Sequence, residues 1–296
     1  MSTTSALETL GAVSNRKLLV FGGGKMATAI VDGVVKIGLF VADNIYVSTR
    51  SEASAAPWRA RGYKNAFTSN SALLDAATAD SDGFTVILLA VKPQLRATLY
   101  AQLAEAAAFG RLAASKSMVI SVLAAISTAT LKQEFQNLKY TGPIVRIMPN
   151  TPCAIGSGTS LICADPSTDA LYVNAAKDIF TAVGSVYEVP ESGFDAASAI
   201  SGCGPAFLFT VIEALADGGV YAGLPRDLAT NLAADMVRGS GALVTASAQA
   251  PGKLKGDVCS PAGTTIAGVR ELEKAGIRSA FIEAVLASTN RAKELR

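Results

Sequence analysis

The chain has 296 residues, half of which are apolar, and it contains no histidine. Without histidine it can form neither a Ser-His-Asp nor a Cys-His relay, nor a histidine-ligated metal site, and we expect no metal. Its 26 basic and 24 acidic residues leave a net charge of +2, which is too balanced to indicate a nucleic-acid partner.

The first fifteen residues are rich in Ser, Thr and Ala and contain no basic residue. They lack the features of a secretory signal or a transit peptide, and we predict a flexible tail over residues 1–15. No run of about 18 apolar residues is present, so we expect no membrane span. The four cysteines form no C-x-x-C pair, which is typical of reduced thiols. Together these features predict a cytoplasmic protein.

From residue 17 to about residue 189, short apolar runs alternate with segments of helical spacing. We predict strands over residues 17–21, 45–48, 84–91, 118–122, 144–148, 159–163 and 185–189. We predict helices from residue 27 to 34 and over residues 51–61, 94–108 and 167–183. This alternation is typical of a parallel sheet with right-handed crossovers. It predicts an α/β domain of the Rossmann type over residues 16–190.

After residue 189 only helical spacing remains, and we predict an all-helical domain over residues 191–296. Its apolar stripes are wide and rich in alanine and glycine, which permit close contacts between helices. A domain of this size often needs a second subunit to cover such stripes. We therefore predict a homodimer that forms through the helical domain.

Gly22, Gly24 and Ala27 form a G-x-G-x-x-A motif between the first predicted strand and the first predicted helix. The first glycine permits a tight turn, the second lets the backbone approach a pyrophosphate, and the small third residue allows close packing. The helix N-terminus adds unpaired N–H groups and a partial positive charge. The motif and its place in the chain predict a dinucleotide site.

The second predicted strand indicates which dinucleotide is bound. It runs into Thr49 and Arg50, without the acidic residue that holds the ribose 2′-hydroxyl of NAD. Hydroxyl groups and an arginine favour a 2′-phosphate, so we predict NADPH, with NADH as the alternative. Arg50 is also consistent with an ordinary solvent-exposed arginine that contacts no cofactor. Lys92 follows the strand over residues 84–91, where a cofactor contact and a plain strand-end lysine are equally consistent with the sequence.

The segment from Ser260 to Gly268 differs from a packing helix. Proline and glycine prevent regular structure up to Gly263, and Thr264 and Thr265 then stand at a predicted helix start. Exposed N–H groups there suit a small carboxylate, although helix capping alone also accounts for the threonines. A second glycine-rich turn, over residues 201–206, opens the first long helix and is equally consistent with close helix packing.

Taken together, four blocks resemble the pyrroline-5-carboxylate reductase family over about residues 16–296. The blocks cover residues 22–27, 91–94 and 146–152, with 201–207 and 260–268 forming the fourth. The resemblance implies a Rossmann domain followed by a helical dimerisation domain like the C-terminal domain of 6-phosphogluconate dehydrogenase. It also implies hydride transfer from NAD(P)H to the C=N carbon of Δ1-pyrroline-5-carboxylate, which gives L-proline. Family members form dimers, sometimes assembled further into rings such as a decamer.

The resemblance also implies roles for individual residues. The implied cofactor-binding residues are Gly22, Gly23, Gly24, Lys25, Met26, Thr49, Arg50, Asn70, Ala90, Val91, Lys92, Pro93, Val122, Leu123 and Ala124. The implied substrate-binding residues are Glu191, Ser260, Gly263, Thr264 and Thr265. Among these, the Thr265 hydroxyl matches the hydrogen-bond partner of the ring nitrogen and is the implied catalytic group.

This chain departs from the family pattern in a few positions. Cys203 replaces a serine, Lys25 replaces an amide residue, and Ala125 and Ala262 replace common glycines. A β-hydroxyacid dehydrogenase would need a catalytic lysine where this chain has Leu208. A non-catalytic nucleotide sensor would not need Thr265. The missing histidine fits an imine reductase, because the substrate nitrogen can be protonated before hydride arrives.

Overall fold

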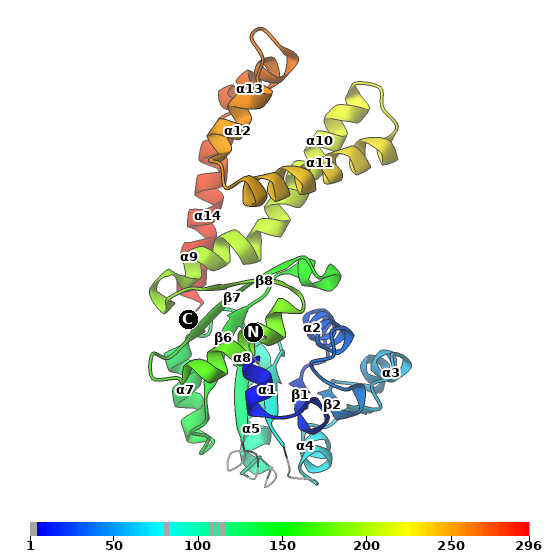
Figure 1. Cartoon of the computed structure of the whole chain (residues 1–296), viewed down its shortest axis with the longest axis vertical. Coiled ribbons are helices and arrows are strands. Elements are labelled where there is room, and N and C mark those ends of the chain that lie inside the picture. Colours follow the sequence, from blue (N-terminus) through cyan, green and yellow to red (C-terminus); the bar gives the residue numbers. More distant parts are fainter. Residues whose placement is uncertain (1–4, 80–82, 107–108, 111, 113–115, 296) are drawn as a thin grey trace. The chain divides into compact units, whose positions relative to one another are not determined.

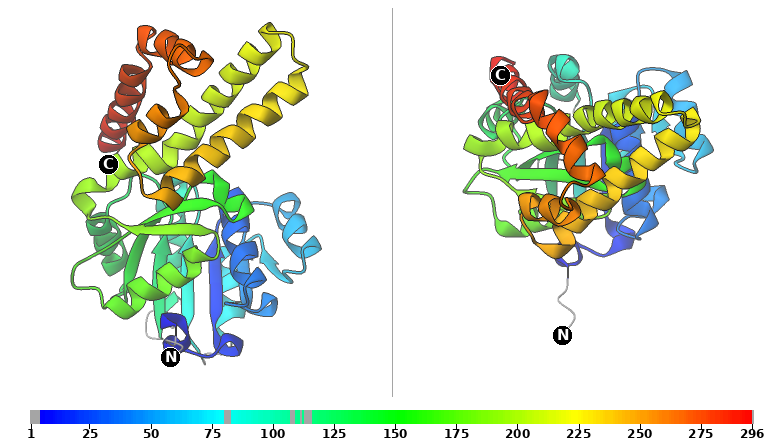
Figure 2. Two further views of the ribbon diagram at one scale, coloured as in Figure 1. Left: turned by 45° about the horizontal axis from the view of Figure 1, so that its top comes forward. Right: turned by 90° about the horizontal axis from the view of Figure 1, so that it is seen from above.

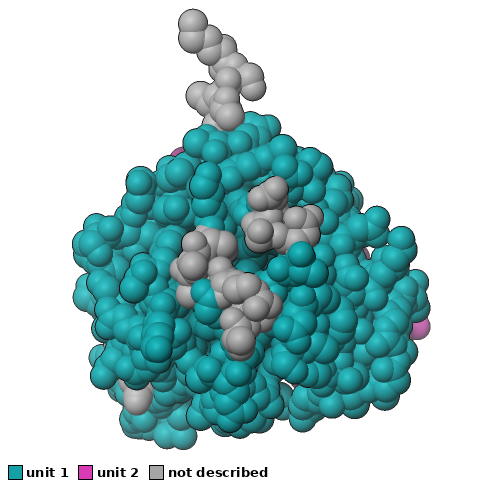
Figure 3. Space-filling model, turned by 90° about the horizontal axis from the view of Figure 1, so that it is seen from below, with its two compact units in different colours: residues 1–202, 289–296 teal, residues 203–288 magenta. Residues whose placement is uncertain are grey.

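The computed structural model describes residues 5–79, 83–106, 109–110, 112 and 116–295 (Figure 1). The chain divides into two compact units, coloured separately in Figure 3. Unit 1 comprises residues 1–202 and 289–296, and unit 2 comprises residues 203–288. The domain boundary predicted at residue 190 differs from this division, which keeps residues 191–202 with the sheet.

A single sheet organises the described part of unit 1. Its strand order is β3-β2-β1-β4-β5-β6-β7-β8. The strands are β1 (Lys17–Phe21), β2 (Ile45–Ser48), β3 (Asn65–Phe67), β4 (Thr85–Leu89), β5 (Ser117–Ser121), β6 (Ile144–Met148), β7 (Gly158–Ala164) and β8 (Gly184–Glu188). Strands β1 to β6 pair in parallel, as predicted, in the order of a dinucleotide-binding fold.

Strand β7 departs from the predicted parallel arrangement, because it is antiparallel to β6 and parallel to β8. Only a short 3-10 helix, η4 (Thr151–Ile155), and a turn separate β6 from β7. Parallel neighbours need a crossover of about a dozen residues or more, so this short link requires an antiparallel pair.

Helices cover both faces of the sheet (Figure 1). The helices α1 (Ala6–Leu10), α2 (Lys25–Lys36), α3 (Glu52–Ala60) and α8 (Ala170–Thr181) contribute to one apolar core. The helices α4 (Asn70–Thr78), α5 (Arg96–Glu105) and α7 (Thr128–Asn137) contribute to the other. Along β1, Leu18 and Val20 enter the first core, whereas Leu19 and Phe21 enter the second. This two-sided burial explains the continuous apolar runs of the strands.

Several predicted elements differ from the observed ones. The helix predicted over residues 94–108 is a 3-10 turn, η3 (Pro93–Leu95), followed by α5, and residues 107–108 lie outside the described part. Strand β3 and helices α4 and α7 were not predicted. The strand predicted over residues 84–91 is shorter, since β4 ends at Leu89.

The flexible tail predicted over residues 1–15 is wrong for residues 5–15. Helix α1 begins after Ser5, which forms a capping box with Glu8, and the short 3-10 helix η1 (Val13–Asn15) follows. Leu7 is fully buried in the first core, and its N–H donates to Asp178 of α8 at 3.2 Å. One buried leucine and a cap therefore hold this segment, although it is too short to show helical periodicity.

Unit 2 consists of helices α10 (Gly204–Tyr221), α11 (Arg226–Ser247), α12 (Pro251–Val258) and α13 (Thr264–Lys274), and it shares α14 (Ile277–Glu294) with unit 1. The helices α10 and α11 lie side by side as an antiparallel hairpin (Figure 2), and the turn between them contains Gly223 at φ +98°. Many large apolar side chains on the helices of unit 2 are exposed, including Phe209 on α10, Leu232 on α11 and Ile282 on α14. By length and composition, the segment Glu191–Tyr221 could also cross a membrane, and 11% of its most apolar stretch is buried.

Candidate functional site

The glycine loop lies where the two halves of the sheet diverge. Strands β1 and β4 are neighbours there, and the chain leaves β1 at Gly22 and β4 at Ala90. Gly22 has a φ of +102°, and a Cβ atom on it would lie 2.7 Å from the Ala90 backbone. Only glycine fits this position. The loop therefore sits at the topological switch point, where α/β sheets of this order bind ligands.

The backbone donors of this loop are not all available to a ligand. The N–H groups of Gly22 and Gly23 both donate to the Ser48 carbonyl, at 3.1 and 3.0 Å. Helix α2 begins at Lys25 with Gly24 as its N-cap, and first-turn amides have no acceptor within the helix. An anion here is therefore held by the start of α2, where the helix dipole adds positive charge.

A cleft of about 820 Å³ opens at this loop. Nine of the predicted cofactor residues line it: Gly22, Gly23, Gly24, Thr49, Arg50, Asn70, Ala90, Val91 and Lys92. Sequence reasoning missed a group of small hydroxyl residues that also line it, namely Ser54, Thr68, Ser69 and Ser71. Three of these lie between β3 and the first turn of α4, two elements that the sequence pattern did not reveal.

The end of the cleft beside β2 is polar and carries an arginine. Thr49 Oγ1 donates to the Ser51 carbonyl at 3.1 Å, and Asn70 Nδ2 donates to Gln102 Oε1 at 2.6 Å. The Arg50 side chain is exposed at the cleft, and the three residues that directly follow β2, Thr49, Arg50 and Ser51, include no carboxylate. Arginine binds phosphate through paired donors, so this end of the cleft fits a phosphorylated ribose.

The other six predicted cofactor residues do not line the cleft. Lys25 is exposed on the first turn of α2, and Met26 packs against the first core. Pro93 begins η3, and the Val122 N–H donates to the Leu89 carbonyl at 3.0 Å. Leu123 is buried and Ala124 is exposed, both directly after β5. Their proposed contacts with a cofactor stay predictions.

Glu191 belongs to a cluster within unit 1 whose other charges are buried. One carboxylate oxygen pairs with the Arg146 guanidinium. The other accepts hydrogen bonds from Thr128 Oγ1 at 2.9 Å and from Cys163 Sγ at 3.6 Å. Burial, with the nearby Glu191 charge, raises the pKa of Cys163 to about 11, so this thiol stays protonated near neutral pH.

Arg146 is the centre of that cluster and is itself only 3% exposed. Its guanidinium stacks 3.9 Å above the Phe194 ring and approaches the Asp195 carboxylate at 3.9 Å. Glu191 thus balances a buried positive charge through contacts inside the protein. This role differs from the predicted substrate contact of Glu191, which stays a prediction.

Two of the sequence blocks meet directly in the structure. The side chain of Asn150 donates to the Ser201 carbonyl at 3.0 Å and accepts from the Thr159 N–H at 2.8 Å. Ser201 lies in a π-helical turn, η6 (Ala199–Cys203), which precedes α10. Such turns have irregular backbone bonding, and Asn150 satisfies one of the carbonyl groups. The Met-Pro-Asn block therefore stabilises, through Asn150, the π-helical turn that precedes α10.

The predicted substrate loop is a tight turn in unit 2. The Gly263 N–H donates to the Ser260 carbonyl at 3.1 Å, with Pro261 second in the turn and Ala262 third, at φ +55°. Proline followed by positive φ defines a type II turn. A Cβ on Gly263 would lie 2.2 Å from Ser260 Oγ, so a side chain there would displace the Ser260 hydroxyl group. Helix α13 begins immediately afterwards, and its first-turn amides can hold a small carboxylate.

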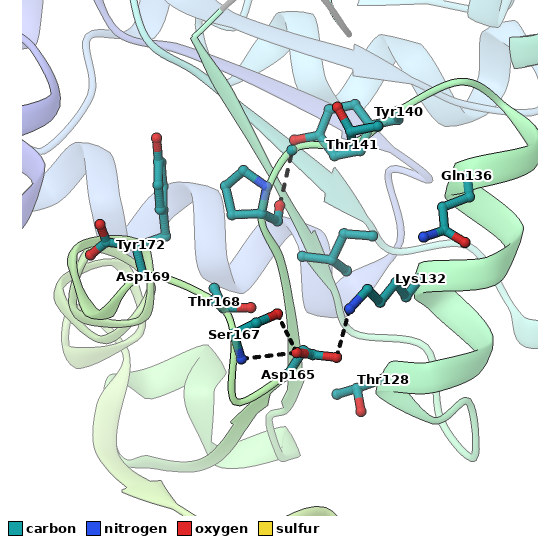
Figure 4. Close-up of a pocket in the computed structure, with 13 residues that line it drawn as sticks. Thr128, Lys132, Gln136, Tyr140, Thr141, Asp165, Ser167, Thr168, Asp169 and Tyr172 are labelled. Carbon is teal, nitrogen blue, oxygen red and sulfur yellow. Dashed lines mark hydrogen bonds and ion pairs between the residues drawn. The ribbon is translucent and has the colours of Figure 1, made fainter.

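A second, smaller cavity of about 270 Å³ lies in unit 1 beside α7 and the start of β6 (Figure 4). Its charged groups bind one another: Lys132 Nζ contacts Asp165 Oδ2 at 2.9 Å, and the Ser167 N–H donates to Asp165 Oδ1 at 2.9 Å. The Ser167 hydroxyl group also donates to Asp165 Oδ1, and together with the two other bonds it holds the pKa of Asp165 near 2. The cavity thus presents a mutually satisfied ion pair, and we assign it no ligand.

Two family models of known proteins match this chain, one in its N-terminal part and one in its C-terminal part. The family model for pyrroline-5-carboxylate reductase dimerisation matches residues 191–295, and the model for NADP oxidoreductase, coenzyme F420-dependent, matches residues 17–125. A pyrroline-5-carboxylate reductase from Synechocystis is 39% identical over 94% of this chain and 98% of its own length. One from Pisum sativum is 35% identical over 98% of this chain and 100% of its own.

Solved structures agree over nearly the whole chain. A pyrroline-5-carboxylate reductase from Coxiella burnetii aligns with a TM-score of 0.80 and 31% identity, covering 96% of this chain and 99% of its own. The pyrroline carboxylate reductase of Plasmodium falciparum, solved with NADP bound, aligns with a TM-score of 0.79 and 29% identity over the same shares.

Proposed function

The chain belongs to the pyrroline-5-carboxylate reductase family, and we propose how its residues divide the work of that reaction. It is an oxidoreductase that acts on a C=N bond, reducing Δ1-pyrroline-5-carboxylate to L-proline with NADPH. In our proposal, the cleft of unit 1 binds the cofactor, and the turn from Ser260 to Gly263, with the start of α13, binds the substrate.

The cleft supports the cofactor assignment because its shape and charge fit a phosphorylated dinucleotide. The start of α2 offers amides to the pyrophosphate beside a backbone that only glycine permits at Gly22. Arg50 and the neighbouring hydroxyl groups fit the 2′-phosphate of NADPH. When bound, the cofactor supplies the hydride that reduces the C=N carbon. NADH has no 2′-phosphate and would leave the Arg50 charge unused.

The Ser260–Gly263 turn is the single observation that carries the substrate assignment. In our proposal, the amides of Thr264 and Thr265 hold the substrate carboxylate, where the dipole of α13 favours a negative charge. The Thr265 hydroxyl then orients the ring nitrogen. Protonation of that nitrogen makes the carbon electrophilic before hydride arrives, so the chain needs no histidine as an acid.

A direct assay tests this function. Purified protein is mixed with NADPH and Δ1-pyrroline-5-carboxylate, and the loss of reduced nicotinamide absorbance is followed across a pH series. We expect substrate-dependent oxidation and the formation of L-proline, and NADH in the same assay gives the cofactor preference. A rate that does not depend on the substrate at any pH would reject the assignment.

The family model supports assembly through the helical part of the chain. We propose a homodimer in which the exposed apolar faces of α10 and α11 cover those of a second copy. Multi-angle light scattering distinguishes this dimer from a decamer. We also propose a cytoplasmic location, which cell fractionation tests.

A further inference from the structure

Trp58 in α3 is the only tryptophan of the chain, and its side chain contacts the glycine loop at Gly23. Its side chain is 3% exposed, and the indole Nε1–H donates to the Gly23 carbonyl at 3.1 Å. A Cβ on Gly23 would lie 2.6 Å from that nitrogen and 2.7 Å from the Thr49 methyl group. Gly23 therefore has no space for a side chain, because Trp58 and Thr49 fill it.

This hydrogen bond sets the direction of the next amide in the loop. In a trans peptide the C=O and the following N–H point in opposite directions, and this chain has no cis peptide in its described part. With the Gly23 carbonyl aimed at Trp58, the Gly24 N–H points away from the indole. The amides of Gly22 and Gly23 are already used by the Ser48 carbonyl, so Gly24 carries the first uncommitted donor of the loop.

Trp58 is itself held in place by contacts that reach α2. Its ring lies 5.4 Å from the Tyr63 ring, and Tyr63 Oη donates to Asp32 Oδ1 at 2.8 Å. Asp32 lies on α2, the helix whose N-cap, Gly24, lines the cleft, and it also pairs with Arg61. The indole therefore packs in a cluster that reaches α2, but its own hydrogen bond to Gly23 does not involve the Tyr63 hydroxyl group.

We propose that Trp58 is a positioning residue for the cofactor pyrophosphate: it orients the Gly23–Gly24 peptide so that the Gly24 amide can donate to a phosphate oxygen. The proposal rests on the proposed function of the cleft as an NADPH site. Trp58 touches the loop rather than the cofactor, and a buried indole N–H without an acceptor is unfavourable, which favours the observed peptide orientation.

The experiment compares Trp58→Phe with the control Tyr63→Phe, which loses a hydroxyl group in the same cluster but keeps the indole. Calorimetry measures binding of NADP+ and of 2′-AMP, a fragment without a pyrophosphate. For Trp58→Phe we expect the Kd for NADP+ to rise about three- to tenfold, the net worth of one hydrogen bond. The Kd for 2′-AMP, and the kcat at saturating NADPH, should stay at wild-type values. Tyr63→Phe should bind both ligands normally.

These readouts separate positioning from general damage to the fold. Equal weakening of NADP+ and 2′-AMP, or an equal effect of Tyr63→Phe, would indicate loss of local structure and overturn the proposal. Unchanged NADP+ affinity in Trp58→Phe would also overturn it. If the wild-type protein does not bind NADP+ at all, the proposed function of the cleft fails first.

Tryptophan emission gives an independent test because Trp58 is the only source of it. NADP+ is used as the ligand, since NADPH absorbs light that tryptophan emits and would quench it without contact. We expect the emission to change saturably with NADP+, with the Kd found by calorimetry. Calorimetric binding of NADP+ with unchanged emission would overturn the coupling between the loop and Trp58.

Discussion

Two of the alanines with positive φ lie in loops where the sequence block of the family has glycine. Ala125 has a φ of +60° in the loop after β5, and Ala262 has a φ of +55° in the substrate turn. A residue with a Cβ in this region costs about 1–2 kcal/mol relative to the right-handed conformation. Both are positions where the family resemblance implies glycine. The positive φ is therefore kept in this chain, although the alanine Cβ makes that conformation less favourable.

We predict that Ala262→Gly stabilises the protein by about 0.5–1 kcal/mol, because relief of the positive φ exceeds the added entropy of the unfolded chain. Urea denaturation measures the gain. Ala248→Gly, at φ +53° after α11 and outside the turn, is the matched control and should stabilise similarly without changing KM. A less stable Ala262→Gly protein would contradict the type II assignment of the turn.

The Thr265 hydroxyl is predicted to act on the substrate and not on the cofactor. Thr265→Ala should lower kcat/KM about tenfold or more, since about 1.4 kcal/mol corresponds to one power of ten in rate. Thr265→Ser keeps the hydroxyl and should retain most of the activity. Calorimetry should show wild-type NADP+ affinity in both variants. Equal kcat/KM in the alanine variant and the wild type would remove Thr265 from the reaction.

Arg50 is predicted to distinguish the two nicotinamide cofactors. Arg50→Ala should raise KM for NADPH by about one power of ten and leave KM for NADH nearly unchanged, because only NADPH carries the 2′-phosphate. Raising the salt concentration should weaken NADPH binding in the wild type more than in the variant. If both cofactors lose affinity equally, Arg50 does not contact the 2′-phosphate.

At the scale of whole elements, an ion pair and a cation–π contact connect β6 to the segment that follows β8. Arg146 on β6 binds Glu191, at the start of η5 (Glu191–Gly193), and stacks on Phe194, at the start of α9 (Phe194–Ser198). Four residues further along the chain from Arg146, Asn150 holds the π-turn that contains Ser201. One strand and its extension therefore fix both ends of the segment that leads into α10.

We predict that Glu191→Gln destabilises unit 1 by about 3 kcal/mol, because it removes the carboxylate that pairs with the buried Arg146 guanidinium. Chemical denaturation measures this. The control is Glu188→Gln, which breaks an exposed ion pair with Lys177 and should change stability by less than about 1 kcal/mol. A stable Glu191→Gln protein with a raised substrate KM would instead support the substrate contact that the sequence implied.

The elements that the sequence revealed are those with a strong apolar pattern. The buried strands β1, β4 and β5 and helix α2 lie close to their predicted bounds, since burial on both faces leaves a continuous apolar run. Strand β3 has three residues and α1 has five, too few to show any period. Thr68, Ser69 and Ser71 of the cleft were missed for the same reason, because they follow β3.

The contacts that assemble the site were beyond sequence reasoning in another way. Nothing in the spacing of the residues relates Trp58 to Gly23 or Asn150 to Ser201, which lie 35 and 51 positions apart. The motif predicts which residues approach a phosphate, but the use of two loop amides by Ser48 depends on how β2 pairs with β1. The local sequence pattern thus predicts the strands and the glycine loop that form the cleft. The pairing of the strands determines which backbone N–H groups of the loop are left to bind a ligand.

At the scale of the whole molecule, the two units differ in how many of their large apolar side chains are exposed to solvent. Unit 1 buries many large apolar side chains, including phenylalanines and leucines, in the two cores that cover the sheet faces. In α10 and α11 of unit 2, the buried residues are alanines, Ala216, Ala229 and Ala233, while much larger side chains remain exposed. Apolar surface of that extent is typical of a subunit interface, in agreement with the dimerisation model that matches this part of the chain.

This contrast leads to a prediction for the assembly. Leu232 on α11 is 55% exposed, and Leu232→Glu would place a charge on the face that we propose to be covered by a second copy. We expect light scattering to show monomers at concentrations where the wild type is a dimer. Asn231→Glu adds the same charge one residue earlier, on a different side of the helix, and should leave the dimer intact.

The same variant separates cofactor binding from catalysis. Every residue that lines the cofactor cleft belongs to unit 1, so monomeric Leu232→Glu should bind NADP+ with wild-type affinity in calorimetry. If the substrate turn of unit 2 needs the assembled helices to hold its shape, the reductase activity should fall while cofactor affinity stays constant. A monomer with full activity would show that one chain is sufficient for the reaction, and a dimeric Leu232→Glu protein would place the interface on another face of unit 2.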